Sequence, residues 1–133
     1  MTIAVKTHSR TELVDITDDV QAAVRQAGVR EGICMVYIPH TTAAVTINEN
    51  ADPTVKGDIL KVINKIIPWD DGYRHLEGNS AAHIKSTLVG ASELVAIAGG
   101  KLQLGTWQGI FFCEFDGPRR RKVQVHFVQD RAV

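Results

Sequence analysis

The order of apolar and polar positions predicts strands near both ends of the chain. Seven runs show either two-residue alternation or a short continuous apolar stretch, and they cover residues 2–9, 13–15, 33–38, 43–47, 93–98, 109–116 and 121–129. The run at 33–38 is apolar throughout and is followed by Pro39, which favours a strand buried on both faces. The last two runs flank the tight turn DGPRR and are expected to form a hairpin.

Apolar residues spaced three to four apart predict two longer helices. Thr17 is the expected N-cap of the first, two aspartates follow in its first turn, and Gly28 is expected to end it. Asp52 and Pro53 form an N-cap and first-turn pair for the second, whose apolar period continues until Pro68. The apolar positions of this second helix are Val55, Ile59, Val62, Ile63 and Ile66.

A third, shorter helix is predicted to start at Asn79 or Ser80 and to end at Gly90, after a loop at 69–78 where the apolar period stops. Helices in the middle and strands at the end predict an α+β fold. We expect a single compact domain over residues 1–133, with a mixed or antiparallel β-sheet and about three helices. The length of 133 residues, with 44% apolar and 23% charged residues, fits one folded core.

Composition narrows the classes of function. Fifteen basic residues balance fifteen acidic ones, so no overall cationic field attracts nucleic acid and any anion must be bound locally. The chain start lacks the apolar stretch of a secretion signal, and no window approaches the ~20 apolar residues of a membrane span, so a cytoplasmic protein is expected. Cys34 and Cys113 lie in separate apolar runs and are expected to be buried thiols, with a disulfide as the alternative.

Three histidines lie at positions that suit a site. His40 follows a predicted strand, His75 lies in the loop before the short helix, and His83 lies on that helix, on the face away from Ile84 and Leu88. Neutral imidazoles bind metal ions and act as acids or bases near pH 7, so together they would suit a divalent metal such as zinc or magnesium. Taken singly, each is better explained as an ordinary hydrogen-bonded histidine.

The segment GTWQGIFFCEFDGPRRRK combines several groups that bind ligands. Its glycines let a ligand approach the backbone, Trp107 offers a stacking face, and the arginines at 119–121 offer paired donors to phosphate. For the arginines alone, a solvated hairpin turn is the favoured explanation. Glu49 and Asn50 are equally open to a site role or none, whereas Asp52 is expected to act as a helix cap.

The segments PHTTAAVTINENADP, HLEGNSAAHIKSTLVG and LQLGTWQGIFFCEFDGPRRRKV closely resemble the three signature segments of the YjbQ-like family. The resemblance, which covers almost the full length, implies a compact α+β homotrimer with a cleft near the subunit contacts. It also implies a secondary thiamine-phosphate synthase activity, in which a pyrimidine-methyl diphosphate loses pyrophosphate and a thiazole phosphate nitrogen captures the carbocation-like centre. Such chemistry needs cations around the diphosphate more than it needs a strong base.

Pattern and resemblance together define a set of candidate site residues. Catalytic roles are expected for His40, His75, His83, Glu49 and Glu114; substrate contacts for Thr41, Asn50, Asn79, Ser80, Lys85, Trp107, Gln108 and Arg119; and metal ligation for His40, His75 and His83. His8 and His126 lie outside the signature segments and are expected to be ordinary strand residues. The recognised fold for this synthase reaction is a TIM barrel, which needs ~200 residues or more, so this chain cannot form it.

Three hypotheses of function follow. The first is a trimeric enzyme acting on a small phosphorylated substrate. The alternative is a non-catalytic module that binds a small anionic metabolite in the same pocket. A third assigns the signature segments to trimer contacts and folding alone.

Overall fold

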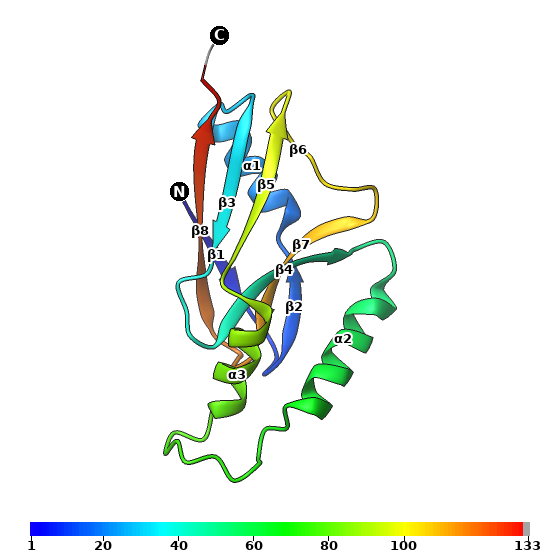
Figure 1. Ribbon diagram of the computed structural model, residues 1–133, viewed down its shortest axis with the longest axis vertical. Helices are drawn as coiled ribbons and strands as arrows, with labels where there is room; N and C mark the ends of the chain where they lie inside the picture. Colours follow the sequence, from blue (N-terminus) through cyan, green and yellow to red (C-terminus); the bar gives the residue numbers. More distant parts are fainter. Residues whose placement is uncertain (132–133) are drawn as a thin grey trace.

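Two antiparallel β-sheets form the framework in the computed structural model, which describes residues 1–131 (Figure 1). The larger sheet has the strand order β1-β8-β3-β5-β6 and the smaller the order β2-β7-β4. The strands are β1 (Thr2–Lys6), β2 (Glu12–Asp15), β3 (Gly32–Tyr37), β4 (Ala43–Glu49), β5 (Ser92–Ala98), β6 (Lys101–Leu102), β7 (Gln108–Glu114) and β8 (Arg120–Gln129). Among the described residues every strand pair is antiparallel, which decides between the mixed and antiparallel alternatives. The predicted hairpin of the last two strands is wrong, because β7 and β8 lie in different sheets and pair with other strands.

Three helices in the described residues complete the fold, as predicted. They are α1 (Thr17–Ala27), α2 (Pro53–Ile66) and α3 (Ser80–Val89). Helix α1 packs into the core between the two sheets, whereas α2 and α3 cover the other face of the smaller sheet (Figure 1). The chain is therefore a single α+β domain, and no helix in the described part of it is long and apolar enough to cross a membrane.

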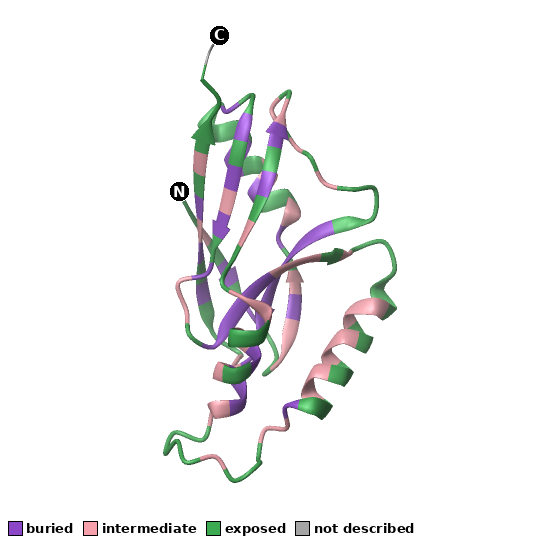
Figure 2. Cartoon of the chain, in the orientation of Figure 1, coloured by how far each residue is buried: buried purple, intermediate pink, exposed green. Residues whose placement is uncertain are grey.

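Strand β7 lies between the two hydrophobic cores and is buried on both faces (Figure 2). Ile110 and Phe112 belong to the core shared by the sheets and α1, while Phe111, Cys113 and Phe115 belong to the core beneath α2 and α3. Successive side chains of a strand point to opposite faces, so one strand supplies both layers. Burying each of these phenylalanines stabilises the fold by roughly 1.5–3 kcal/mol.

Strand β3 is not buried on both faces, so that prediction is wrong. Cys34 and Val36 are fully buried, but Ile33 and Tyr37 on the opposite face are exposed. The strand is central, between β5 and β8, yet no helix or sheet formed by residues 1–131 covers the outer face of the five-stranded sheet (Figure 1). The apolar run indicates that both faces of the strand are hydrophobic. It does not indicate which of the two faces another layer of the fold covers.

Helix starts follow the sequence at α2 and depart from it at α1. Asp52 caps α2 as predicted, because its Oδ1 accepts the Thr54 N–H at 2.9 Å. Thr17, however, is the first residue of α1 rather than its N-cap. Its hydroxyl oxygen donates to Asp15 Oδ1 at 2.6 Å and accepts the Ile110 N–H at 2.8 Å. Thr17 therefore fastens the start of α1 to β7, and Gly28 ends the helix in a left-handed conformation as expected.

Helix α3 buries a different face from the one predicted. Ala81, Ala82 and Lys85 are buried, whereas Ile84 is exposed and Leu88 is 66% exposed. The two alanines lie on the face that packs against β4, where small side chains allow a close approach of the helix backbone. The apolar stripe expected to face the core is thus turned outward, and a lysine takes its place.

The structure also places the two remaining histidines and the two cysteines. His126 lies on β8 and is exposed, as expected, but His8 lies in the loop after β1 and not in a strand. Cys34 and Cys113 are free and buried, which confirms the predicted thiols. Burial raises the pKa of Cys34 to about 11 and that of Cys113 to about 12, so both thiols are protonated at neutral pH.

Candidate functional site

A polar cleft lies between the β3–β4 loop and the start of β8. It has a volume of about 540 Å³ and is lined by Tyr37, Pro39, His40, Thr41, Thr42, Arg119 and Arg121. We call it the His40 cleft. Three of the predicted site residues, His40, Thr41 and Arg119, line it.

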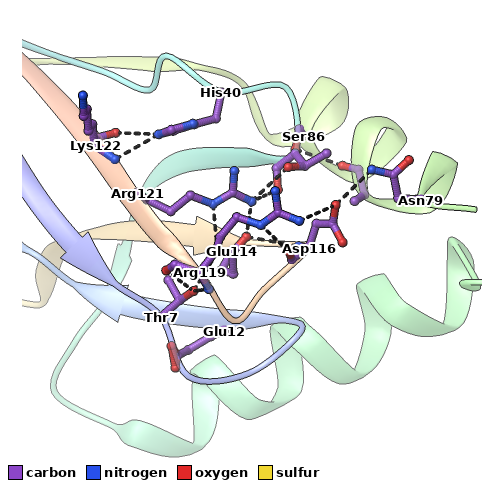
Figure 3. A network of polar contacts seen from close by, with 12 residues as sticks. Thr7, Glu12, His40, Asn79, Ser86, Glu114, Asp116, Arg119, Arg121 and Lys122 are labelled. Atoms are coloured by element: carbon purple, nitrogen blue, oxygen red, sulfur yellow. Dashed lines mark hydrogen bonds and ion pairs between the residues drawn. The ribbon is translucent and has the colours of Figure 1, made fainter. Parts of the chain in front are cut away.

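Under this cleft lies a buried ion pair between Glu114 and Arg121 (Figure 3). The Arg121 guanidinium donates to both carboxylate oxygens of Glu114, and its Nη2 also donates to Thr42 Oγ1 at 2.9 Å. Thr7 Oγ1 donates to Glu114 Oε1 at 2.7 Å, and the Asp116 N–H donates to Oε2 at 3.1 Å. The network fastens the end of β1, the β3–β4 loop, β7 and β8 to one another.

Glu114 was expected to be catalytic, but its surroundings give it a structural role. Its side chain is fully buried and both oxygens accept hydrogen bonds from groups of the chain itself. Burial alone raises the pKa of Glu114, but donors from Arg121, Thr7 and the Asp116 N–H outweigh it and hold the pKa below its usual value. Glu114 is therefore a carboxylate that holds Arg121 in place and does not face the cleft.

His40 is held in one orientation at the rim of the cleft. Its Nε2 accepts the Lys122 N–H at 2.9 Å and lies 3.1 Å from the Lys122 carbonyl oxygen (Figure 3). Partial burial and the positive charge of Arg121 lower the pKa of His40, and they outweigh the carbonyl contact that raises it. The ring is therefore neutral at pH 7 and carries its proton on Nδ1, which has no partner among residues 1–131.

Arg119 is the accessible cation of the cleft. Its side chain is 50% exposed, its Nε donates to the Asp116 carbonyl at 2.8 Å, and its Nη2 lies 3.2 Å from Asp116 Oδ2. The turn that carries it lies against the loop after β1, where a Cβ on Gly117 would stand 2.4 Å from the Ser9 carbonyl oxygen. Only glycine permits this close approach, and the resulting position of the turn sets the position of Arg119.

A second cleft, of about 490 Å³, lies at the start of α3. It is lined by Tyr73, Arg74, His75, Ser80, His83 and Ile84. The His75 and His83 rings meet edge to face, with their centroids 5.5 Å apart. We call it the His75–His83 cleft.

Asn79 and Asp116 connect the two clefts. Asn79 Nδ2 donates to Asp116 Oδ2 at 2.9 Å, the oxygen that also faces Arg119 (Figure 3). Asn79 Oδ1 is buried without a hydrogen-bond partner in the described part of the chain. Asn79 thus positions Asp116 and does not cap α3, since its side chain makes no capping bond.

The three histidines do not meet within one chain. His75 and His83 form a pair, but His40 lines the other cleft. Between residues 1 and 131, no group of three histidine, cysteine or acidic side chains is placed to hold a metal ion. The donor set of one subunit therefore does not fit the three-histidine zinc or magnesium site, and a third ligand would have to come from another subunit.

Four other predicted site residues lie at the far end of the smaller sheet. Glu49 pairs with Gln108 at the opposite end of the β4–β7 ladder from Ala43 and Glu114, about 20 Å away at ~3.4 Å per residue. Trp107 is 63% exposed there, and its carbonyl accepts the Asn50 N–H at 2.9 Å. Gln108 folds back so that its Oε1 accepts the Gly105 N–H at 2.8 Å. This corner, which we call the Trp107 corner, is held by these hydrogen bonds and exposes the indole to solvent.

Lys85, expected to contact substrate, lines neither cleft. It is 2% exposed, and its Nζ donates to Asn64 Oδ1 of α2 at 2.7 Å. The predicted site residues therefore occupy four places in one chain: the His40 cleft, the His75–His83 cleft, the Trp107 corner and the space beneath α2.

Sequence reasoning missed the residues that build the cleft. Arg121 was taken as one of three similar arginines, although it stands two residues before Val123 and four before Val125, on the buried face of β8. Period-two alternation alone would have assigned Arg121 inward and Arg120 outward. Thr7 and Thr42 carry no comparable signal, because their partners come from distant strands.

Comparison with known proteins places the chain among close relatives. A family profile described as UPF0047 protein YjbQ-like matches residues 1–130. A UPF0047 protein of Methanocaldococcus jannaschii is 55% identical over 127 residues, covering 96% of this chain and 92% of that protein. The UPF0047 protein YugU of Bacillus subtilis is 54% identical over 121 residues, covering 90% of this chain and 92% of that protein.

Solved structures share the whole fold. An uncharacterised YjbQ/UPF0047 protein from Clostridium acetobutylicum aligns with a TM-score of 0.94 at 52% identity, covering 96% of this chain and 99% of that one. A hypothetical protein from Aeropyrum pernix aligns with a TM-score of 0.93 at 37% identity, covering 98% of each. The two-sheet arrangement is thus common to these proteins.

Proposed function

The chain belongs to the YjbQ-like UPF0047 family, and we propose that it is a trimeric enzyme that acts on a small phosphorylated substrate in the His40 cleft. The proposed reaction resembles that of thiamine-phosphate synthase, an alkyl transfer with release of pyrophosphate. One observation carries the proposal: the half-exposed Arg119 and the neutral His40 line the same polar cleft, above a buried ion pair that fixes the cleft floor.

The proposed reaction needs little acid or base catalysis from the protein. The C–O bond of the pyrimidine-methyl diphosphate breaks with its electron pair leaving on pyrophosphate, and the nitrogen lone pair of the thiazole phosphate forms the new C–N bond. The developing charge on pyrophosphate is stabilised by a cation and by hydrogen-bond donors. Arg119 supplies the accessible cation, and the Nδ1–H of His40 supplies a neutral donor.

Assembly into a trimer is proposed on two observations. An apolar groove between α2 and α3 is lined by Val55, Asp58, Ile59, Val62, Ile63, Ile66, Leu88 and Val89, and its apolar residues include exposed side chains. The Trp107 corner, about 20 Å along the sheet at ~3.4 Å per residue, presents candidate site residues away from both clefts of its own subunit. A contact between subunits that buries the groove could bring a Trp107 corner to a neighbouring cleft.

The proposal is tested first by binding of inorganic pyrophosphate, measured by calorimetry. Replacing Arg119 removes the accessible cation, so R119Q should weaken binding at least tenfold, the effect of ~1.4 kcal/mol. Arg120 is the matched control, since it is the next residue, carries the same charge and is exposed outside the cleft. Equal losses in R119Q and R120Q would contradict a specific site.

Turnover separates the enzyme from a binding module. Glu114, the carboxylate beneath the cleft, is buried and its oxygens are occupied by hydrogen bonds within the chain. Because it does not reach a ligand in the cleft, this observation favours a module that binds a small anionic metabolite without altering it. Release of pyrophosphate from a mixture of the pyrimidine-methyl diphosphate and the thiazole phosphate, lost in R119Q, supports the enzyme. Pyrophosphate binding without any release of product supports the module.

Metal involvement and location belong to the same proposal. Elemental analysis of the purified protein tests whether residues of several subunits together with His75 and His83 form a metal site.

A cytoplasmic location is proposed because both cysteines are free and buried, which suits a reducing compartment.

A further inference from the structure

Lys85 is the one lysine among the buried polar residues of the described chain. It lies on the inner face of α3, where Ala81 and Ala82 are its buried neighbours, and α2 lies over it. The His40 cleft and the His75–His83 cleft do not include it. The function proposed above therefore leaves this side chain without a role.

The contacts of Lys85 leave its charge uncompensated. Its Nζ donates to Asn64 Oδ1 at 2.7 Å, and Asn64 Nδ2 donates in turn to Thr11 Oγ1 at 3.2 Å. An ammonium has three donors, so two remain without a protein partner. Within residues 1–131 no carboxylate lies within 4 Å of Nζ, because the ion pairs of this part of the chain are those of Arg119 and Arg121.

A second positive charge adds to the cost of keeping Lys85 charged. Burial lowers the pKa of Lys85, and the positive charge of Arg10 lowers it further. Arg10 is exposed, and its guanidinium carbon lies 4.2 Å from the centre of the Trp69 ring. Thr11, which accepts a hydrogen bond from Asn64, is the residue after Arg10, so the chain brings a surface cation to the neighbourhood of the buried Lys85. Buried charges are normally paired.

We propose that Lys85 and Arg10 together bind a phosphate group, with Asn64 and Thr11 as polar neighbours and the Arg10–Trp69 pair as its cover. A phosphate dianion matches the two positive charges and accepts the free donors of Lys85 and the guanidinium donors of Arg10. Lys85 is closed to solvent, so the side chains around it have to move when the anion enters. This site is separate from the His40 cleft and does not depend on the reaction proposed there.

Trp69 provides the measurement. The chain has two tryptophans, so W107F leaves Trp69 as the single indole. Titrating this protein with inorganic phosphate at constant ionic strength should give a saturable change in Trp69 fluorescence, whereas sodium chloride alone should give none. A response equal to that of sodium chloride, or no saturable response, would overturn the proposal.

Variants assign the signal to the site. In the W107F background, K85M and R10Q should each raise the apparent Kd for phosphate at least tenfold. R119Q, which alters the His40 cleft, and K61M, an exposed lysine on α2, should leave it within twofold. Arg10 is exposed, so R10Q is expected to fold normally. If K85M fails to fold, R10Q alone tests the proposal. Unchanged phosphate binding in R10Q, or a loss of binding in R119Q alone, would contradict a phosphate site at Lys85 and Arg10.

Discussion

At the scale of single residues, the His40 cleft separates side chains that hold the fold from side chains free to meet a ligand. Glu114 and Arg121 are buried and satisfied by one another and by two threonines. Arg119, two residues before Arg121 and adjacent in the turn, is half-exposed. The same residue type therefore has two roles, because Arg121 lies on the buried face of β8, whereas Arg119 lies in the turn that precedes the strand.

Breaking the buried ion pair should destabilise the fold strongly. Glu114→Gln leaves the Arg121 guanidinium buried without its counter-charge, a change that typically costs 3–5 kcal/mol, so about 3 kcal/mol or more is expected. Urea unfolding measures the loss, and E77Q, at an exposed loop position, should stay within about 0.5 kcal/mol of the parent. A loss below about 1 kcal/mol in E114Q would show that the pair does not fix the cleft floor.

The pKa of His40 predicts how stability depends on pH. Because the folded state lowers this pKa below 6.5, the unfolded chain binds the proton more readily, and stability falls as pH drops through 6.5 and below. Thermal unfolding of the wild type and of His40→Gln between pH 5 and 8 should therefore show curves that converge toward acid. Parallel curves would mean that the His40 environment does not favour the neutral ring.

At the scale of elements, α2 is the least integrated part of the described chain. None of its residues is fully buried, and one side of it packs on the smaller sheet through half-buried Ile59, Leu60 and Ile63 (Figure 2). Its own helix signals, the Asp52 cap and the apolar period, are strong. Local signals thus specify α2, while none of its residues is fully buried by the rest of the chain.

Gly57 in the middle of α2 offers a stabilising substitution. A Cβ built there meets nothing within 4 Å, so Gly57→Ala should stabilise the protein by roughly 0.5–1 kcal/mol through helix propensity and reduced unfolded-state entropy. The matched glycine is Gly109, where a Cβ would stand 2.7 Å from Asn50 Nδ2. G109A should lower the melting temperature while G57A raises it, and a rise in both would refute the packing argument.

At the scale of the whole molecule, the part of the chain that the structure describes leaves two apolar surfaces uncovered. One is the α2–α3 groove, and the other is the outer face of the five-stranded sheet, which carries Ile33, Leu94 and Val128. Exposed apolar area of this kind marks contact surfaces. The trimer proposal assigns the groove to the subunit contact.

Charge on the groove should dissociate the assembly without unfolding the subunit. Val62 and Ile66 are 55% and 65% exposed, so V62E/I66E removes little from the core of the monomer. Light scattering during size-exclusion should show a monomer for this variant and a trimer for the wild type, with unchanged circular dichroism. L94E on the open sheet face is the control, and dissociation by L94E alone would move the interface to the sheet.

The sequence by itself determined the helices, most strand positions, the α+β class and the buried thiols, because these depend on local periodicity and on capping residues such as Asp52 and Gly28. It also marked His40 and Arg119 as candidate site residues, and both line the same cleft.

Only the tertiary structure decided which faces are covered and which residues meet. It turned Ile84 and Leu88 outward, buried Lys85, sealed Glu114 and separated the histidines into two clefts. Periodicity shows that a residue can lie on a given face of its element, but the partner of that face comes from distant strands and helices. The pairing of Thr7 with Glu114, 107 positions apart, depends on that long-range packing.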